Sequence, residues 1–145
     1  MPELSVDDFS FEPPYGSSGT TIKKIKKNRF LVDLGHEPEH PEWRSKLQFT
    51  LNNAKGNRLH LDCLFDYDRD KEMKYNGYFL SWSYDRINWR PIHWTYADDR
   101  DGWNNPHNLI FPEFTEDTVY VGAQVPYTIE TLKRFLAEWE KSPYV

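Results

Sequence analysis

The fold of this chain is decided by residues 46–65, which read KLQFTLNNAKGNRLHLDCLF. Apolar residues alternate with polar ones before residues 52–57 and again after them. A period of two places every second side chain on one face of a strand. Two such runs on either side of a Gly-bearing turn predict a β-hairpin with one face in a core and the other in water.

Further strands are expected on both sides of this pair, at residues 20–27, 29–34, 77–83, 89–96, 109–111 and 118–123. Pro91 interrupts its strand, which places that strand at a sheet edge or on a bulge. Residues 1–19 are expected to form an N-terminal arm, because PPYGSSG breaks regular structure there. The basic run at residues 23–29 either contacts an anionic partner or is an edge strand that lysines protect from aggregation, and we favour the edge strand.

The pattern changes at Thr128. Thr128 is an expected helix N-cap and Pro143 stops the helix. Apolar residues then recur at helical spacing, at Ile129, Leu132, Phe135, Leu136 and Trp139. We therefore predict a mainly β chain: one domain over residues 1–145, an antiparallel β-sandwich of eight or nine short strands with one C-terminal α-helix at residues 128–141.

Composition excludes several classes of function. The 24 aromatic residues and only two Met favour pleated, half-buried surfaces over helix bundles. A net charge of −5 argues against a nucleic-acid partner. No apolar run approaches the roughly 20 residues of a membrane span, and no signal peptide is visible. We expect a cytoplasmic location and no membrane partner.

The sequence marks no catalytic or metal-binding residue. His36 to His40 match H-E-x-x-H, but Pro38 and Pro41 prevent the helix that would put both histidines on one face. Cys63 is the single cysteine, which excludes an internal disulfide, and it lies on the apolar parity of its strand. We expect Cys63 to be an inert core thiol.

Aromatic residues gather between residues 82 and 103. The group consists of Trp82, Tyr84, Trp89, Trp94, Tyr96 and Trp103. One interpretation is a platform that stacks on sugar rings, as in a carbohydrate-binding module. The other is that Trp82 is core and the remaining rings pack at the edge of the sandwich or against a neighbouring domain.

The order of several segments resembles a known family. WRSKLQF at residues 43–49 leads into NNAKG at residues 52–56, and SYDRINW follows at residues 83–89. DTVYV at residues 117–121 precedes VPYT at residues 125–128, which opens the helix. This arrangement, from about Phe9 to Val145, is similar to the N-terminal β-sandwich domain of cytosolic-carboxypeptidase-like zinc metallocarboxypeptidases, including their bacterial members.

The resemblance implies a non-catalytic accessory domain. The catalytic domain of the parent zinc metallocarboxypeptidase, a peptide hydrolase, would follow Val145 and hold the zinc. This chain would pack beside it, shape the access of peptide or protein substrates, and support its folding. The expected interdomain contacts are Trp94, Tyr96, Trp103, Trp139 and Tyr144. A carbohydrate-binding module or a stand-alone interaction domain are the alternatives.

The proline-interrupted H-E-x-x-H stretch gives a first prediction. The chain should not bind zinc stoichiometrically, because Pro38 and Pro41 prevent helical presentation of His36 and His40. Calorimetric titration with zinc at neutral pH tests this. Tight binding that disappears in a His36→Ala variant would contradict it.

Overall fold

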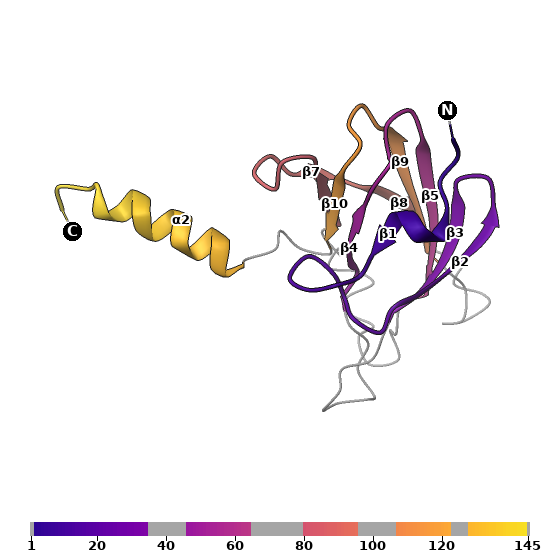
Figure 1. Ribbon diagram of the computed structural model, residues 1–145, viewed down its shortest axis with the longest axis horizontal. Coiled ribbons are helices and arrows are strands. Elements are labelled where there is room, and N and C mark those ends of the chain that lie inside the picture. Colours follow the sequence, from indigo (N-terminus) through magenta and orange to yellow (C-terminus); the bar gives the residue numbers. More distant parts are fainter. Residues whose placement is uncertain (1, 35–45, 65–79, 96–106, 123–127, 145) are drawn as a thin grey trace.

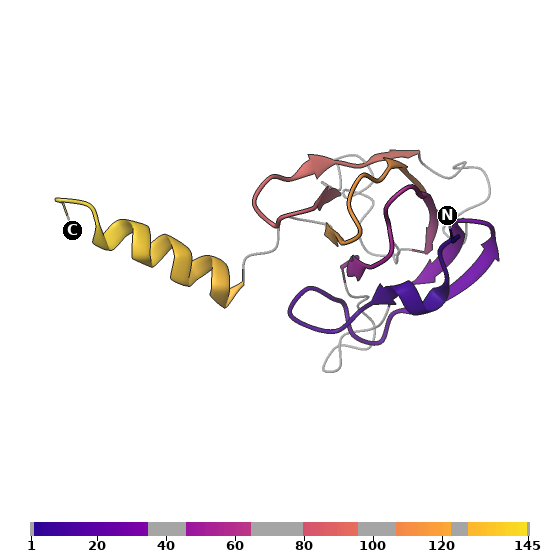
Figure 2. The same cartoon turned by 45° about the horizontal axis from the view of Figure 1, so that its top comes forward.

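The computed structural model of the chain describes residues 2–34, 46–64, 80–95, 107–122 and 128–144. Two β-sheets face each other, and a helix extends from one end of them (Figure 1, Figure 2). The first sheet contains, in spatial order, β1 (Phe9–Ser10), β4 (Gln48–Leu51), β10 (Val119–Gly122), β6 (Ser81–Ser83) and β7 (Arg90–Pro91). The second contains β2 (Thr21–Lys26), β3 (Arg29–Asp33), β5 (Arg58–Leu64), β9 (His107–Glu113) and β8 (His93–Thr95).

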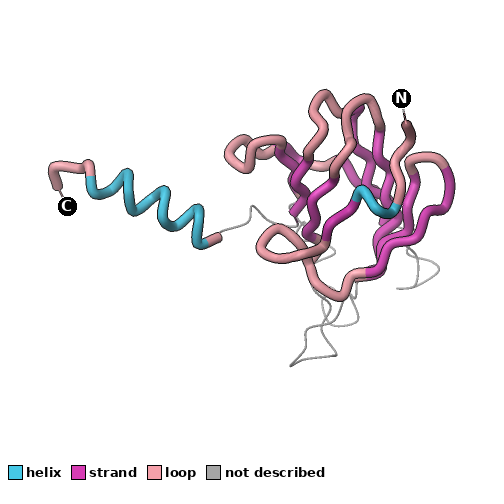
Figure 3. Tube along the Cα trace, in the orientation of Figure 1, coloured by secondary structure: helices cyan, strands magenta, loops and turns pink. Residues whose placement is uncertain are grey.

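Two helical elements complete the described part of the chain. A short 3-10 helix, η1 (Val6–Asp8), precedes β1, and the α-helix α2 (Ile129–Glu140) is the last element. Figure 3 shows the separation of strand and helix along the trace. The predicted class, a mainly β sandwich with one C-terminal helix, is confirmed. One strand pair departs from the antiparallel pattern, because β3 and β5 run parallel.

The inner faces of the two sheets form the hydrophobic core. Phe49 and Leu51 on β4, and Leu61 and Cys63 on β5, have no exposed surface. Alternate residues on the other long strands are buried in the same way. The period of two in the sequence therefore identified the core-facing residues correctly.

The predicted hairpin at residues 47–65 is wrong in its pairing. β4 pairs with β1 and β10 in one sheet, whereas β5 pairs with β3 and β9 in the other. Residues 52–57 cross from one sheet to the other, with the Ala54 side chain fully buried. The crossing is fixed by Ala54 N–H, which donates to the Asp117 carbonyl at 2.9 Å, and by Gly56 N–H, which donates to the Phe114 carbonyl at 2.8 Å. Two strands in facing sheets, joined by such a crossing (an arch), bury the same alternate residues as two paired strands of a hairpin. The alternating pattern therefore could not distinguish an arch from a hairpin.

Residues in the expected N-terminal arm belong to the sandwich. Leu4 is fully buried, and β1 adds to the first sheet with Phe9 opposite Leu51. The Phe9 ring packs at 4.8 Å from that of Phe30 and 5.4 Å from that of Phe49, measured between centroids. This segment joins the two inner faces of the core.

Edge positions agree with the sequence analysis. The strand expected at residues 89–96 divides at Ile92 into β7, at the edge of the first sheet, and β8, at the edge of the second. Pro91 is therefore at an edge, as predicted. The lysine-rich β2 is the other edge of the second sheet, as favoured above.

Cys63 is fully buried, and desolvation raises the pKa of its thiol far above the ordinary range. Because the thiolate is the reactive form, Cys63 should react slowly with thiol reagents in the folded chain and rapidly in denaturant. A Thr115→Cys variant supplies a matched exposed thiol that should react quickly in both conditions. Equal rates for Cys63 with and without denaturant would contradict its burial.

Candidate functional site

The helix α2 begins where the sequence predicts. Thr128 is extended at the N-cap, and its Oγ1 accepts a hydrogen bond from Thr131 N–H at 3.2 Å. Glu130 lies in the first turn, where a carboxylate also interacts favourably with the helix dipole. The start of the helix is thus defined by local chemistry.

The Glu130 carboxylate links α2 to the sandwich. Tyr15 Oη donates to Glu130 Oε2 at 2.6 Å, and the Arg86 guanidinium lies 3.3 Å from the same oxygen. Arg86 also stacks over two rings, 4.6 Å from the centroid of Tyr15 and 5.1 Å from that of Tyr120. We call Tyr15, Arg86, Tyr120 and Glu130 the anchor cluster.

The turn between β6 and β7 fixes Arg86 in place. Asp85 Oδ1 accepts hydrogen bonds from the backbone N–H groups of Ile87 and Asn88, each at 2.8 Å. These bonds hold the pKa of the Asp85 carboxyl well below its usual range, and the bond from Asn88 contributes most. Arg86 itself is in the left-handed region with φ of 63°, a conformation that a non-glycine residue adopts only when its surroundings impose it.

Tyr15 is presented by a tight loop after β1. A Cβ atom at Gly16 would clash with the carbonyl carbon of Phe11, so the chain can pass this point only with glycine. Ser17 Oγ donates to the Lys46 carbonyl, and Ser17 N–H donates to the Gln48 carbonyl at 2.8 Å. The loop is thereby attached to the start of β4.

The start of α2 places polar side chains next to the sandwich, and the rest of the helix extends away from it (Figure 1). A hollow of about 230 Å³ between them is lined by Glu130, Thr131 and Arg134 of α2 and by Tyr15, Asp85, Arg86 and Ile87 of the sandwich. Successive helix residues lie about 100° apart, so Leu132 and Trp139 are on the side roughly opposite Arg134. Leu132 and Trp139 are consequently on the side of α2 that does not line this hollow.

Large apolar side chains on that face are exposed. The exposed fractions are 72% for Ile129, 38% for Leu132, 44% for Leu136 and 57% for Trp139, and Phe135 between them is half-buried. Clustered exposure of this kind marks interaction surfaces, whereas single exposed apolar residues are ordinary. We regard this face of α2 as the candidate functional site.

Two of the five predicted interface residues can be placed here. Trp139 belongs to this face, and Tyr144 beyond the helix is 95% exposed. The backbone of Trp94 lies in β8 opposite Leu109. The Trp94 side chain, Tyr96 and Trp103 lie outside the described residues, as do His36 and His40.

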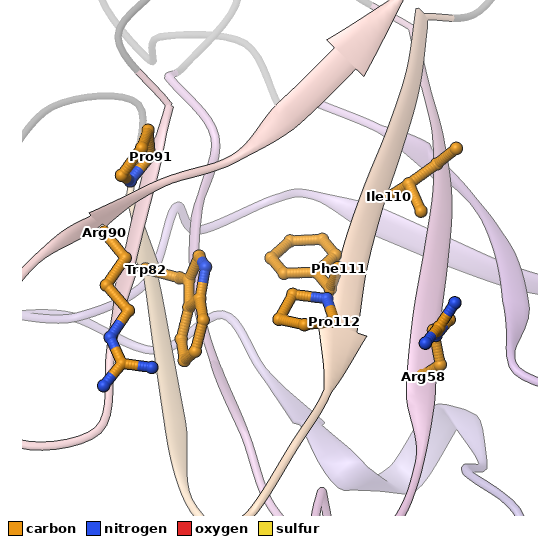
Figure 4. Close-up of a pocket in the computed structure, with 7 residues that line it drawn as sticks. All are labelled: Arg58, Trp82, Arg90, Pro91, Ile110, Phe111 and Pro112. Atoms are coloured by element: carbon orange, nitrogen blue, oxygen red, sulfur yellow. The ribbon is translucent and has the colours of Figure 1, made fainter.

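A second hollow, of about 480 Å³, lies where the chain passes from β7 in the first sheet to β8 in the second (Figure 4). Trp82, Phe111 and Pro112 stand between Arg90 on one side and Arg58 on the other. The Arg90 guanidinium covers the Trp82 ring at 5.0 Å. Since Trp82 and Phe111 are buried, this hollow presents mainly proline, isoleucine and arginine side chains.

Trp82 and Tyr84 do not form a sugar-binding platform. Trp82 is 3% exposed, as expected for a core residue. Tyr84 meets Trp82 edge to face at an interplanar angle of 81°, and Trp89 is half-buried. A platform needs coplanar, exposed ring faces, which Trp82 and Tyr84 do not provide.

A polar group on the outer side of the second sheet is structural. Arg29 donates two hydrogen bonds to Asp62, from Nε at 2.8 Å and from a terminal nitrogen at 3.1 Å. This contact raises the pKa of Arg29 and connects the parallel strands β3 and β5. His60 Nε2 lies 3.2 Å from Asn108 Oδ1, which extends the contact to β9.

The described ranges contain no group of three or more His, Cys, Asp or Glu side chains that could hold a metal ion. They also contain no helix long and apolar enough to cross a bilayer.

The comparisons with known proteins identify the fold. No protein-family model matches the sequence, and a search of curated proteins gave no match. The fold is similar to that of a metallo-carboxypeptidase from Burkholderia cenocepacia, with a TM-score of 0.66 and 18% identity. It is also similar to a metallo-carboxypeptidase from Pseudomonas aeruginosa, with a TM-score of 0.56 and 16% identity.

The extent of these matches is one-sided. The first covers 93% of this chain and 34% of the other, and the second covers 90% and 32%. The chain therefore spans about a third of the length of the solved structures it matches. In both of these metallo-carboxypeptidases the matched fold is one part of a longer chain, which agrees with the resemblance seen in the sequence.

The anchor cluster was missed by the sequence analysis. Tyr15 and Glu130 are 115 positions apart, and Arg86 and Glu130 are 44 apart. Glu130 was recognisable as a first-turn carboxylate, but no local pattern indicates its partners. The exposed apolar face of α2, in contrast, is visible in the helical spacing of residues 129–139.

The anchor cluster predicts a pH dependence. The hydrogen bond from Tyr15, followed by the charge of Arg86, lowers the pKa of Glu130 below its ordinary value of 4.5. Because its pKa is lowered, the ionised Glu130 carboxylate stabilises the folded chain, in which it contacts Tyr15 and Arg86, fully above pH 4.5. This stabilisation is lost as the pH falls through the lower pKa of the folded chain. NMR titration of the Glu130 carboxyl carbon should show the depressed pKa, and Arg86→Gln should raise it towards 4.5. An unchanged pKa in this variant would contradict the contact.

Proposed function

We propose that this chain is a non-catalytic accessory domain of a zinc metallocarboxypeptidase. It packs beside the catalytic part of a longer chain through the apolar face of α2, shapes the access of peptide substrates to the active site, and supports the folding of that part. The single observation that carries the proposal is the exposed apolar face of α2, which does not pack on the core that this chain builds within its described residues (Figure 1).

A further observation supports the proposal. The structural neighbours are metallo-carboxypeptidases of which this fold makes up about a third, so in those proteins the fold is joined to a longer remaining part of the chain. Following the resemblance, we assign the zinc chemistry to that remaining part of the parent protein. Contacts between domains of one chain typically bury roughly 600–1,500 Å², a size that one face of a three-turn helix and its surroundings can supply.

A carbohydrate-binding module fits the structure less well. In the aromatic group at residues 82–103, Trp82 is buried, Tyr84 packs edge to face on it, and Arg90 covers both rings. A stand-alone interaction domain would use the same apolar face of α2, and the two functions differ in whether the partner belongs to the same polypeptide.

Substitution of Trp139 tests the docking. In a longer protein that contains this chain and a metallocarboxypeptidase region, Trp139→Ala should lower the free energy of unfolding by about 1.5–3 kcal/mol, the amount for one large apolar side chain. In the 145-residue chain alone the same change should have little effect, because Trp139 is 57% exposed. Thermal or denaturant unfolding of both proteins measures the difference.

Glu138→Ala is the matched control, because Glu138 is an exposed residue of the same helix on its polar side. It should leave both proteins unchanged within a few tenths of a kcal/mol. Hydrogen exchange adds an independent measure: the amides of residues 129–140 should be better protected in the longer protein. Equal protection, together with equal stability of the Trp139→Ala proteins, would refute the proposed docking.

A further inference from the structure

We propose that the anchor cluster of Tyr15, Arg86, Tyr120 and Glu130 is a positioning device that orients α2 before it docks on the catalytic part of its own chain. The inference rests on the function proposed above. It adds that the docking surface already has its final orientation in the undocked sandwich, and it assigns Glu130 as the residue on which this orientation depends.

The geometry of the cluster supports this role. Three separate parts of the fold meet at the Glu130 carboxylate, namely the loop after β1, the β6–β7 turn and the first turn of α2, and Tyr120 of β10 packs against Tyr15 and Arg86. Two donors reach the same Glu130 oxygen from different elements, at 2.6 and 3.3 Å. A contact restrained from two directions limits rotation of the helix as well as its separation from the sandwich.

The chemistry of the cluster explains why the apolar face stays free. An amphipathic helix usually packs its apolar face against the nearest core. Here Glu130 in the first turn is bonded to the sandwich, and Thr131 and Arg134 on the same side of the helix line the hollow next to it. Leu132 and Trp139 therefore remain available to another surface, and the polar contacts need not be broken when that surface docks.

Pre-orientation has an energetic consequence. A helix that is free to reorient loses rotational and conformational freedom on docking, and this loss opposes association. A helix already held at the docking angle loses less. The occupant we assign is the catalytic part of the same polypeptide, because the sandwich covers only about a third of the metallo-carboxypeptidase chains that share its fold.

Distances between spin labels test the orientation in the 145-residue chain. Thr115→Cys on the sandwich and Ala137→Cys on the helix provide two exposed labelling sites, whereas Cys63 is buried. We expect one narrow distance distribution. Glu130→Ala should broaden it, and so should Tyr15→Phe, which removes only the hydroxyl. Glu138→Ala is the matched control on the same helix and should leave the distribution narrow. An equally narrow distribution in the Glu130→Ala chain would overturn the inference.

Hydrogen exchange in the longer protein separates this inference from the proposed function. Glu130→Ala should weaken the protection of residues 129–140, as should Trp139→Ala. If only Trp139→Ala has an effect, docking stands and the positioning role of the anchor cluster fails. If neither has an effect, the proposed docking itself fails. Concentration-dependent dimerisation of the 145-residue chain, abolished by Trp139→Ala, would make a second copy the occupant and overturn our assignment.

Discussion

Each sheet of the sandwich has one apolar face, and the need to bury both faces against each other determines how the chain is routed. Residues 52–57 cross between the sheets and place Ala54 in the core. Ile92 makes the second crossing, where its N–H donates to the Leu80 carbonyl at 3.0 Å. Both crossings are held by backbone hydrogen bonds. The edge strands β7 and β8, and the turn before β7 that carries Arg86, therefore have defined positions.

The sequence identified which side chains face the core, but it could not identify which strands pair. Alternation in Leu47–Leu51 and Leu59–Cys63 describes one strand at a time. A hairpin and an arch then differ only in the hydrogen-bond partners of each backbone, which lie far away in the sequence. The same limit explains the parallel pairing of β3 with β5, since the Arg29–Asp62 contact that connects them joins residues 33 positions apart.

The candidate site shows a similar division. The helix, its Thr128 cap and its apolar face follow from local spacing and were predictable. The direction in which that face points depends on Tyr15 and Arg86, which come from two loops with no shared sequence pattern. The Gly16 close approach and the left-handed Arg86 are visible only in three dimensions. The apolar face of α2 is thus determined by the local sequence, whereas the direction in which it points is determined by tertiary contacts.

The attachment of α2 at its first turn makes the helix a lever with its pivot at Glu130. Twelve residues give it a length of about 18 Å. A rotation of about 10° at the pivot would move the far end by about 3 Å, roughly the width of one atom layer. Mechanical strain applied near Trp139 would in turn be delivered to the Arg86 turn and the Tyr15 loop. The sandwich could therefore register movement of whatever holds the tip of the helix.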